Sequence, residues 1–150
     1  MQITEDEVRE LIQLKQAKGE TVDLHGRDLS ALGLSELDLA GADLSQSDLR
    51  GATLSKSNLS QADLTRANLS QVDLQKANLN GANLSQAELF GANLSEANLR
   101  DASLRGAGLD GANLSQTDLQ ETDLGGAKYT DYTRWPLDFD PAQAGAIKSY

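Results

Sequence analysis

Few residues of this chain are of the types that catalyse reactions or hold metals. The 150 residues include one histidine, His25, and no cysteine. The sequence therefore offers no thiol nucleophile, no disulfide and no cysteine-based zinc site. His25 follows a leucine at a position that we expect to face solvent, and the serines of the chain have no partnered base. Because catalysis needs groups that converge in a concave site, we predict no enzymatic activity, no metal site and no cofactor.

The charge of the chain limits its partners. Asp and Glu number 23 against 13 Lys and Arg, which gives a formal net charge of −10. This sign disfavours nucleic acid and anionic membranes, and it suits a basic partner or simply solubility. The opening residues, MQITEDEVRE, are acidic, and no stretch approaches the ~18–20 apolar residues that cross a bilayer. We expect a soluble, cytoplasmic protein whose partner is another protein, with no direct binding to nucleic acid or membrane.

A leucine stands at every fifth position from Leu24 to Leu124, twenty-one times in succession. This period belongs neither to an α-helix, with about 3.6 residues per turn, nor to a strand, with a period of about two. The residue two before the leucine is usually alanine from Ala42 onward. The residue just before it is Asp or Asn in sixteen of the twenty-one units, and the fifth place is often glycine.

Each preference has a physical reason. A large and a small apolar residue two positions apart point to the same side of an extended segment. Asp and Asn accept hydrogen bonds from main-chain N–H groups at turns, and glycine tolerates the positive φ that a type II turn requires. Each unit is therefore a short extended piece followed by a turn. No unit can bury its own leucine, so the units must stack into a solenoid.

Units such as Ala62-Asp63-Leu64-Thr65-Arg66 and Ala92-Asn93-Leu94-Ser95-Glu96 resemble those of the pentapeptide-repeat family. The similarity covers about residues 22–127, and the two ends resemble those of cyanobacterial members. The resemblance implies a β-solenoid of the right-handed, quadrilateral parallel β-helix type, with four units per twenty-residue coil. Twenty-one units then give about five coils. We expect one domain over residues 1–150.

Residues 1–20 are predicted to form a helix that caps the front of the coils in 22–127. Thr4 and Glu7 have the spacing of a capping box, and Gly19 can end the helix. Arg27 occupies an inward place of the first coil where later units carry alanine. An inward arginine needs an anionic or carbonyl partner, so we expect a carboxylate of the helix beside it, or, as the alternative, a bound anion.

Residues 128–150 are predicted to close the other end. Five of the six aromatic residues lie there, and four of them are candidates for a cap or for dimer contacts: Tyr129, Tyr132, Trp135 and Phe139. Aromatic side chains suit both a lid over the last coil and a homodimer interface, so a monomer and a dimer joined at this end both stay open. Pro141 is expected to open a short helix that continues through Ala146.

The function predicted from these features is that of a non-enzymatic interaction module or scaffold. Such a module presents a stiff, acidic, flat-faced rod to another protein. Phe90 is the only aromatic residue inside the repeat, and acidic residues concentrate in the early units. The candidate interaction surface comprises Phe90, Asp43, Asp48, Asp63, Arg100 and Arg105.

The resemblance also implies an alternative. Some members of the family imitate B-form DNA with an acidic rod and inhibit DNA gyrase. Residues 22–127 carry fifteen Asp and Glu against seven Lys and Arg, as that role requires. Those members look longer, often have phenylalanine at the central place and in some cases carry loops, whereas this repeat has only leucine and no loops. Mimicry of DNA is therefore the second hypothesis, and enzymatic activity the third.

Overall fold

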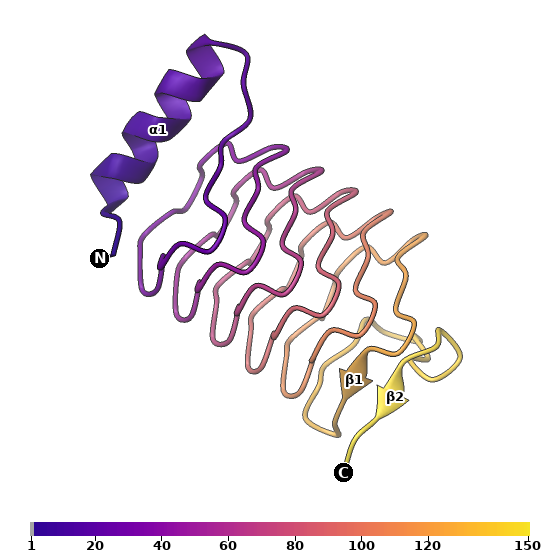
Figure 1. The fold of residues 1–150 in the computed structure, drawn as a ribbon. Helices are drawn as coiled ribbons and strands as arrows, with labels where there is room; N and C mark the ends of the chain where they lie inside the picture. Colours follow the sequence, from indigo (N-terminus) through magenta and orange to yellow (C-terminus); the bar gives the residue numbers. More distant parts are fainter. Residues whose placement is uncertain (1) are drawn as a thin grey trace.

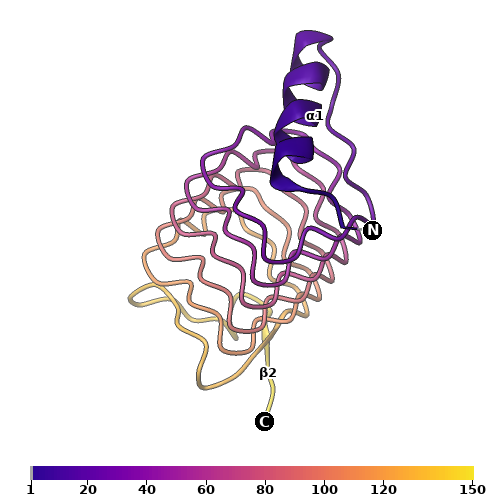
Figure 2. The ribbon, with the colours of Figure 1, turned by 90° about the vertical axis from the view of Figure 1, so that its left-hand side faces the viewer.

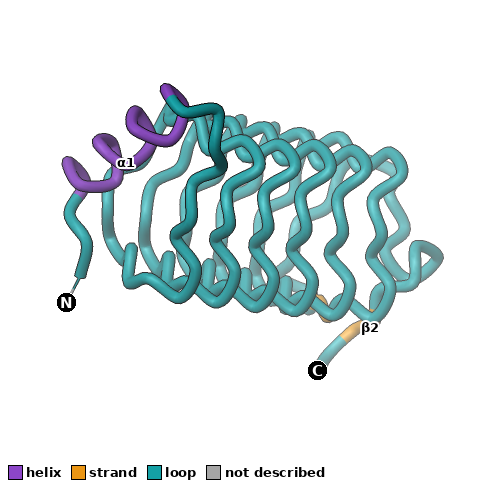
Figure 3. The backbone as a smooth tube through the Cα atoms, turned by 45° about the horizontal axis from the view of Figure 1, so that its top comes forward, coloured by secondary structure: helices purple, strands orange, loops and turns teal. Residues whose placement is uncertain are grey.

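The computed structural model describes residues 2–150 and consists mainly of stacked coils (Figure 1). Eighteen of the nineteen isolated bridges in this part of the chain join residues twenty positions apart, from Asp23↔Asp43 to Gly108↔Lys128, and all are parallel. Four five-residue units therefore complete one coil. Each extended piece contributes only one bridged residue, so most of the chain has no regular strand (Figure 3).

Hydrogen bonds between neighbouring coils hold the stack together. The Leu44 N–H donates to the Asp63 carbonyl at 2.7 Å, and the Asp63 N–H donates back to the Ala42 carbonyl at 2.9 Å. The same pair of bonds recurs along most of the repeat. The main chain of each inner coil is thus paired on both sides, which makes the repeat a stiff body.

Every unit ends in a turn whose fifth residue has a positive φ. All twenty-one of these residues, from Gly26 to Gly126, have φ between 57° and 70°. Eight are glycine and thirteen are not. The carbonyl of the leucine accepts the N–H three residues later, as between Leu39 and Ala42 at 3.0 Å, which is the bond of a type II turn. The turn therefore does not require glycine at this place, since Gln, Lys, Glu, Arg, Asp and Ala adopt the same conformation.

The leucines at every fifth position form the leucine ladder, which fills the interior. Twenty of the twenty-one are buried, and only Leu119 is half-buried. From Ala42 onward, mostly small residues two positions before the leucine fill the space between the layers. Where a hydroxyl takes that place it finds a carbonyl, as Ser47 Oγ does by donating to the Leu44 carbonyl at 2.6 Å. The ladder and the small residues beside it therefore form a packed core in which the buried hydroxyls have hydrogen-bond partners.

Helix α1, Glu5–Ala17, lies across the first coil (Figures 1 and 2). It begins with the predicted capping box, in which Thr4 and Glu7 exchange side-chain and main-chain hydrogen bonds, and Gly19 follows its end with φ 67°. Val8 and Ile12 are buried against the core. Within residues 2–150, no helix has the length and the apolar character that crossing a membrane requires.

The last residues return to the stack. Strand β1, Lys128–Tyr129, pairs in parallel with β2, Ile147–Lys148, so β2 takes the position of a further coil (Figure 1). The expected helix from Pro141 to Ala146 is wrong, because these residues form consecutive turns. Gly145 has φ 94°, outside the helical region, and the Ala146 N–H reaches the Pro141 carbonyl five residues back. Six residues closed by such a glycine are too short for a stable helix.

Candidate functional site

The residue before each leucine has a structural task. In all sixteen units where it is Asp or Asn, its Oδ1 accepts the main-chain N–H two residues further on, at 2.9–3.2 Å. Both residue types supply this acceptor, so the bond needs no charge. The carboxylates at these places are therefore free to set the charge of the surface.

The three acidic candidates lie on two adjacent columns of the early coils. Asp43 pairs with Asp63 in neighbouring coils, while Asp48 follows Asp43 by five residues and so occupies the next face. Hydrogen bonds from the Ser45 hydroxyl and amide hold the pKa of the Asp43 carboxyl below its ordinary value. The Asp48 carboxyl has a lowered pKa because Arg50 donates to it from Nε at 2.8 Å and from Nη2 at 2.6 Å.

His25 takes part in a short chain of hydrogen bonds. Its Nδ1 lies 2.8 Å from Ser45 Oγ, and that hydroxyl donates to Asp43 Oδ1. The order differs from a Ser-His-Asp triad, because the serine proton is directed at the carboxylate and no base removes it. The contact arises from the twenty-residue coil, which places residues 25 and 45 side by side. The sequence analysis did not predict this contact, although the separation of twenty residues between His25 and Ser45 could have indicated it.

The three remaining surface candidates do not form one patch. Phe90 is 56% exposed, and Arg100 lies ten residues away, which is half a coil and so the opposite side of the rod. Arg100 donates to Gln120 Oε1 at 2.5 Å and pairs with Asp118 at 3.4 Å. Arg105 pairs with Asp123 at 3.2 Å. Both arginines therefore form ion pairs with the coil that follows them, and neither forms a common surface patch with Phe90.

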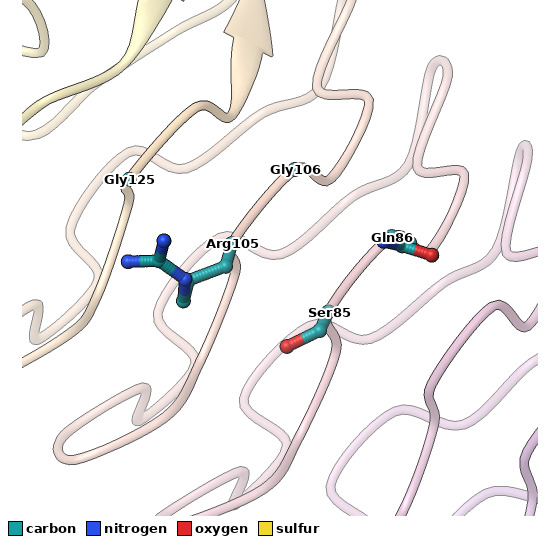
Figure 4. Close-up of a pocket in the computed structure, with 5 residues that line it drawn as sticks. All are labelled: Ser85, Gln86, Arg105, Gly106 and Gly125. Carbon is teal, nitrogen blue, oxygen red and sulfur yellow. The ribbon is translucent and has the colours of Figure 1, made fainter.

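A hollow of about 310 Å³ lies beside Arg105 (Figure 4). It is lined by residues one coil apart, namely Ser85 and Gln86, then Arg105 and Gly106, then Gly125. Arg105 leans over Gly125, where a Cβ would stand 2.8 Å from Nη1. The hollow exists because Gly125 has no side chain to fill the space beside Arg105. In residues 2–150 no group of three or more His, Cys, Asp or Glu could hold a metal ion.

A second hollow, of about 390 Å³, lies under α1 and is lined by Gln2, Ile3, Glu7, Leu11 and Arg27. Arg27 is exposed there, and no hydrogen bond or ion pair joins it to the helix among the described residues. The expected inward position of Arg27 is therefore wrong, and Glu7, the helix carboxylate that lines the same hollow, makes no ion pair with it. A long arginine side chain can leave the interior with its charged end in water.

The aromatic residues of the closing segment behave in two ways. Trp135 lies edge-on to Tyr129 with ring centroids 5.6 Å apart, and it stacks on Phe139 at 5.2 Å. All three pack against the core. Tyr132 is 83% exposed and does not join them. The structure thus brings three of the four predicted aromatic residues together at the end of the rod.

Comparison with families of known proteins gives one match. The model of the family described as Pentapeptide repeats matches residues 34–71, 67–106 and 97–128, with eight copies. A comparison with curated proteins gave no match.

Several solved structures are similar. A pentapeptide repeat protein from the cyanobacterium Cyanothece 51142 is 28% identical, and the alignment covers 85% of this chain and 98% of that one with a TM-score of 0.43. A pentapeptide repeat protein from Nostoc Pcc 7120 is 32% identical, with 95% of each chain covered and a TM-score of 0.34. One from the Arabidopsis thaliana thylakoid lumen is 33% identical over 69% of this chain and 68% of that one, with a TM-score of 0.38.

Proposed function

Because the chain belongs to the pentapeptide-repeat family, whose members are right-handed quadrilateral β-helices and generally structural or interaction modules, we propose that it is a protein-interaction module. It acts by presenting a surface to a basic partner protein, without turnover and without a cofactor. The rigid coils hold the charged side chains of that surface in fixed positions, which lowers the entropic cost of binding.

The observation that carries this proposal is the acidic surface of the repeat. Residues 22–127 contain fifteen Asp and Glu against seven Lys and Arg. Asp23, Asp43 and Asp63 stack in one column of successive coils. Like charges at such spacing create a field that attracts and orients a basic partner.

Binding experiments test the acidic surface directly. A partner captured from the source cells is purified and titrated against the wild type and against the Asp43→Asn, Asp48→Asn, Asp63→Asn triple variant, at low and high salt. We expect the triple variant to bind more weakly, and binding to weaken as salt rises, because exposed charges are screened over ~10 Å at 0.1 M. The variant keeps its fold because Asn already accepts the same bond in seven units.

Two controls make the outcome decisive. If Phe90→Ala abolishes binding while the triple variant retains it, the charge-based proposal is wrong and the aromatic side chain is the anchor. Turnover of a substrate, or a small molecule bound in a one-to-one ratio to the purified protein, also contradicts the proposal.

DNA mimicry is the second candidate function, and the same acidic surface supports it. A supercoiling assay with purified DNA gyrase separates the two. Inhibition that the triple variant loses supports mimicry, whereas gyrase that keeps its activity at saturating protein leaves the scaffold function.

A further inference from the structure

A third hollow, which we call the C-terminal hollow, lies where the closing segment covers the last coil incompletely. It measures about 300 Å³ and is lined by Leu119 and Gln120 of the coil and by Pro136, Leu137, Asp138 and Phe139 of the closing segment, with Thr117 beside them. Leu119 is the one half-buried member of the leucine ladder. Its side chain therefore keeps apolar area that the chain itself leaves uncovered.

Leu137 stands beside this hollow with its side chain 94% exposed. A tight turn holds it there, because the Phe139 N–H donates to the Pro136 carbonyl at 3.1 Å and Asp138 has φ 63°. This is the turn geometry of the repeat units, and it points an apolar side chain into water instead of into the core. A large apolar side chain fixed in that way is available for a partner at little entropic cost.

Acidic residues without ion pairs lie in the hollow or next in sequence to residues that line it. Asp138 lines it, Glu121 follows Gln120 directly and Asp140 follows Phe139 directly. None of these three acids has an ion pair within residues 2–150, unlike Asp118, Asp123 and Asp131, which are each paired with a basic side chain. A hollow that combines the apolar side chains of Leu119 and Leu137 with the carboxylate of Asp138 is complementary to an apolar side chain between basic ones.

We propose that the C-terminal hollow binds a segment of the partner protein in which one large apolar side chain is flanked by Lys or Arg. The apolar side chain lies between Leu119 and Leu137, and the basic side chains face Glu121, Asp138 and Asp140. The hollow has room for one or two such side chains and is at the lower end of the size of small-molecule sites. This proposal rests on the proposed function as a module for a basic partner, and it names a second place of contact.

The test uses a defined peptide probe, with one leucine between two pairs of lysines, titrated into isotopically labelled full-length protein and followed by NMR. We expect the amide signals of residues 117–121 and 136–140 to shift. Replacing the leucine of the peptide by alanine is expected to weaken binding by roughly tenfold or more, since burial of a leucine contributes that much. Replacing its lysines by glutamate is also expected to weaken binding, because like charges then face one another.

Protein variants locate the site. Leu137→Ala removes an exposed side chain and cannot leave a cavity, and Asp138→Asn keeps a residue type that tolerates a positive φ. Both are expected to weaken peptide binding, whereas Leu14→Ala, which removes another exposed leucine on α1, is expected to leave it unchanged. Equal shifts with the leucine and alanine peptides, or binding that Leu137→Ala does not alter, overturn the proposal.

Two further measurements distinguish a failure of the proposed C-terminal site from dimerisation and from a failure of the proposed function. If the protein alone dimerises in ultracentrifugation and Leu137→Ala abolishes the dimer, a second copy occupies the hollow and the proposal is wrong. If the Asp43→Asn, Asp48→Asn, Asp63→Asn variant loses the captured partner while Leu137→Ala keeps it, the proposed function stands and only the C-terminal site fails.

Discussion

The carboxylate of Glu5 accepts the main-chain N–H of Gly33 at 2.7 Å. The carbonyl of the same glycine accepts from Arg9 Nη2 at 3.2 Å. Gly33 lies in the first coil, where no preceding coil exists to pair with it. Side chains of α1 therefore form hydrogen bonds with both main-chain groups of Gly33. In later coils the corresponding main-chain groups bond to the preceding coil. An added Cβ on Gly33 would stand 3.1 Å from Glu5 Oε1, so the glycine permits this approach.

Replacing Glu5 by alanine is expected to destabilise the first coil by about 1 kcal/mol, because the N–H of Gly33 loses its acceptor. Hydrogen exchange measured by NMR checks this, with faster exchange expected at Gly33 and little change in the middle of the repeat. Asp6→Ala is the matched control, since it removes the same charge from the first turn of α1, and the Asp6 side chain makes no hydrogen bond or ion pair within residues 2–150. Equal effects of the two variants would show that helix charge, and not the bond to Gly33, matters.

Leu74→Ala in the middle of the ladder is expected to cost about 2–5 kcal/mol of unfolding free energy. Leu74 is fully buried, and the coils on both sides are held by main-chain hydrogen bonds, so they cannot close the resulting cavity. Urea denaturation followed by circular dichroism measures the loss. The control is Ser70→Ala, at an outward position whose hydroxyl makes no hydrogen bond within the described residues. This variant is expected to leave the free energy of unfolding nearly unchanged. A loss below about 1 kcal/mol at Leu74 would contradict its role in the core.

Asp101→Gly is expected to stabilise the protein by about 1 kcal/mol. Asp101 has φ 59° and an exposed side chain that makes no hydrogen bond within residues 2–150, so glycine relieves a strained conformation without the loss of a contact. Gly51→Ala is the reverse change at φ 68°, with no atom within 4 Å of the added Cβ, and is expected to cost about as much. Denaturation midpoints of both variants check the pair. Shifts in the same direction would show that the backbone conformation does not decide the effect.

Much of the fold follows from the period of the sequence. The leucine positions, the small residues beside them and the capping box of Thr4 and Glu7 depend only on neighbours within a few residues, so local chemistry predicts them. The thirteen non-glycine residues at positive φ could not be predicted in this way. Their strain is offset by the bonds between coils, which a single unit does not reveal. The turns after Pro141 escaped prediction for a related reason, because the pairing of β2 with β1 draws that segment back to the stack.

The candidate site was less predictable than the fold. Sequence position placed Phe90 and Arg100 near one another in the chain, but half a coil separates them. The contact between His25 and Ser45 and the hollow beside Leu137 arise from residues that lie in different coils or in the closing segment. The side chain of Arg27 is exposed because it is long enough to reach water. The position of Arg27 in the repeat does not determine this orientation.

Four carboxyl groups, those of Asp28, Asp43, Asp48 and Asp123, have a pKa below the ordinary value of 3.8. In Asp28 and Asp43 the main cause is a serine hydroxyl two residues on, which donates to the carboxylate. A carboxyl whose pKa is lowered by folding contributes stability above its unfolded pKa. That contribution is lost as the pH falls through the lower, folded pKa.

Stability is therefore expected to fall as the pH drops below about 3.8, and Asp43→Asn is expected to make this fall less steep. The asparagine still accepts the Ser45 N–H, but it no longer titrates, so the variant keeps the turn and loses the pH-dependent part. Urea midpoints measured between pH 2 and 6 check the slope. Asp63→Asn is the matched control, because it removes the same charge one coil further on, where only the Thr65 amide donates to the carboxylate. Identical slopes for the two variants would mean that overall charge repulsion governs acid unfolding, and that the hydroxyl bond at Asp43 adds nothing to it.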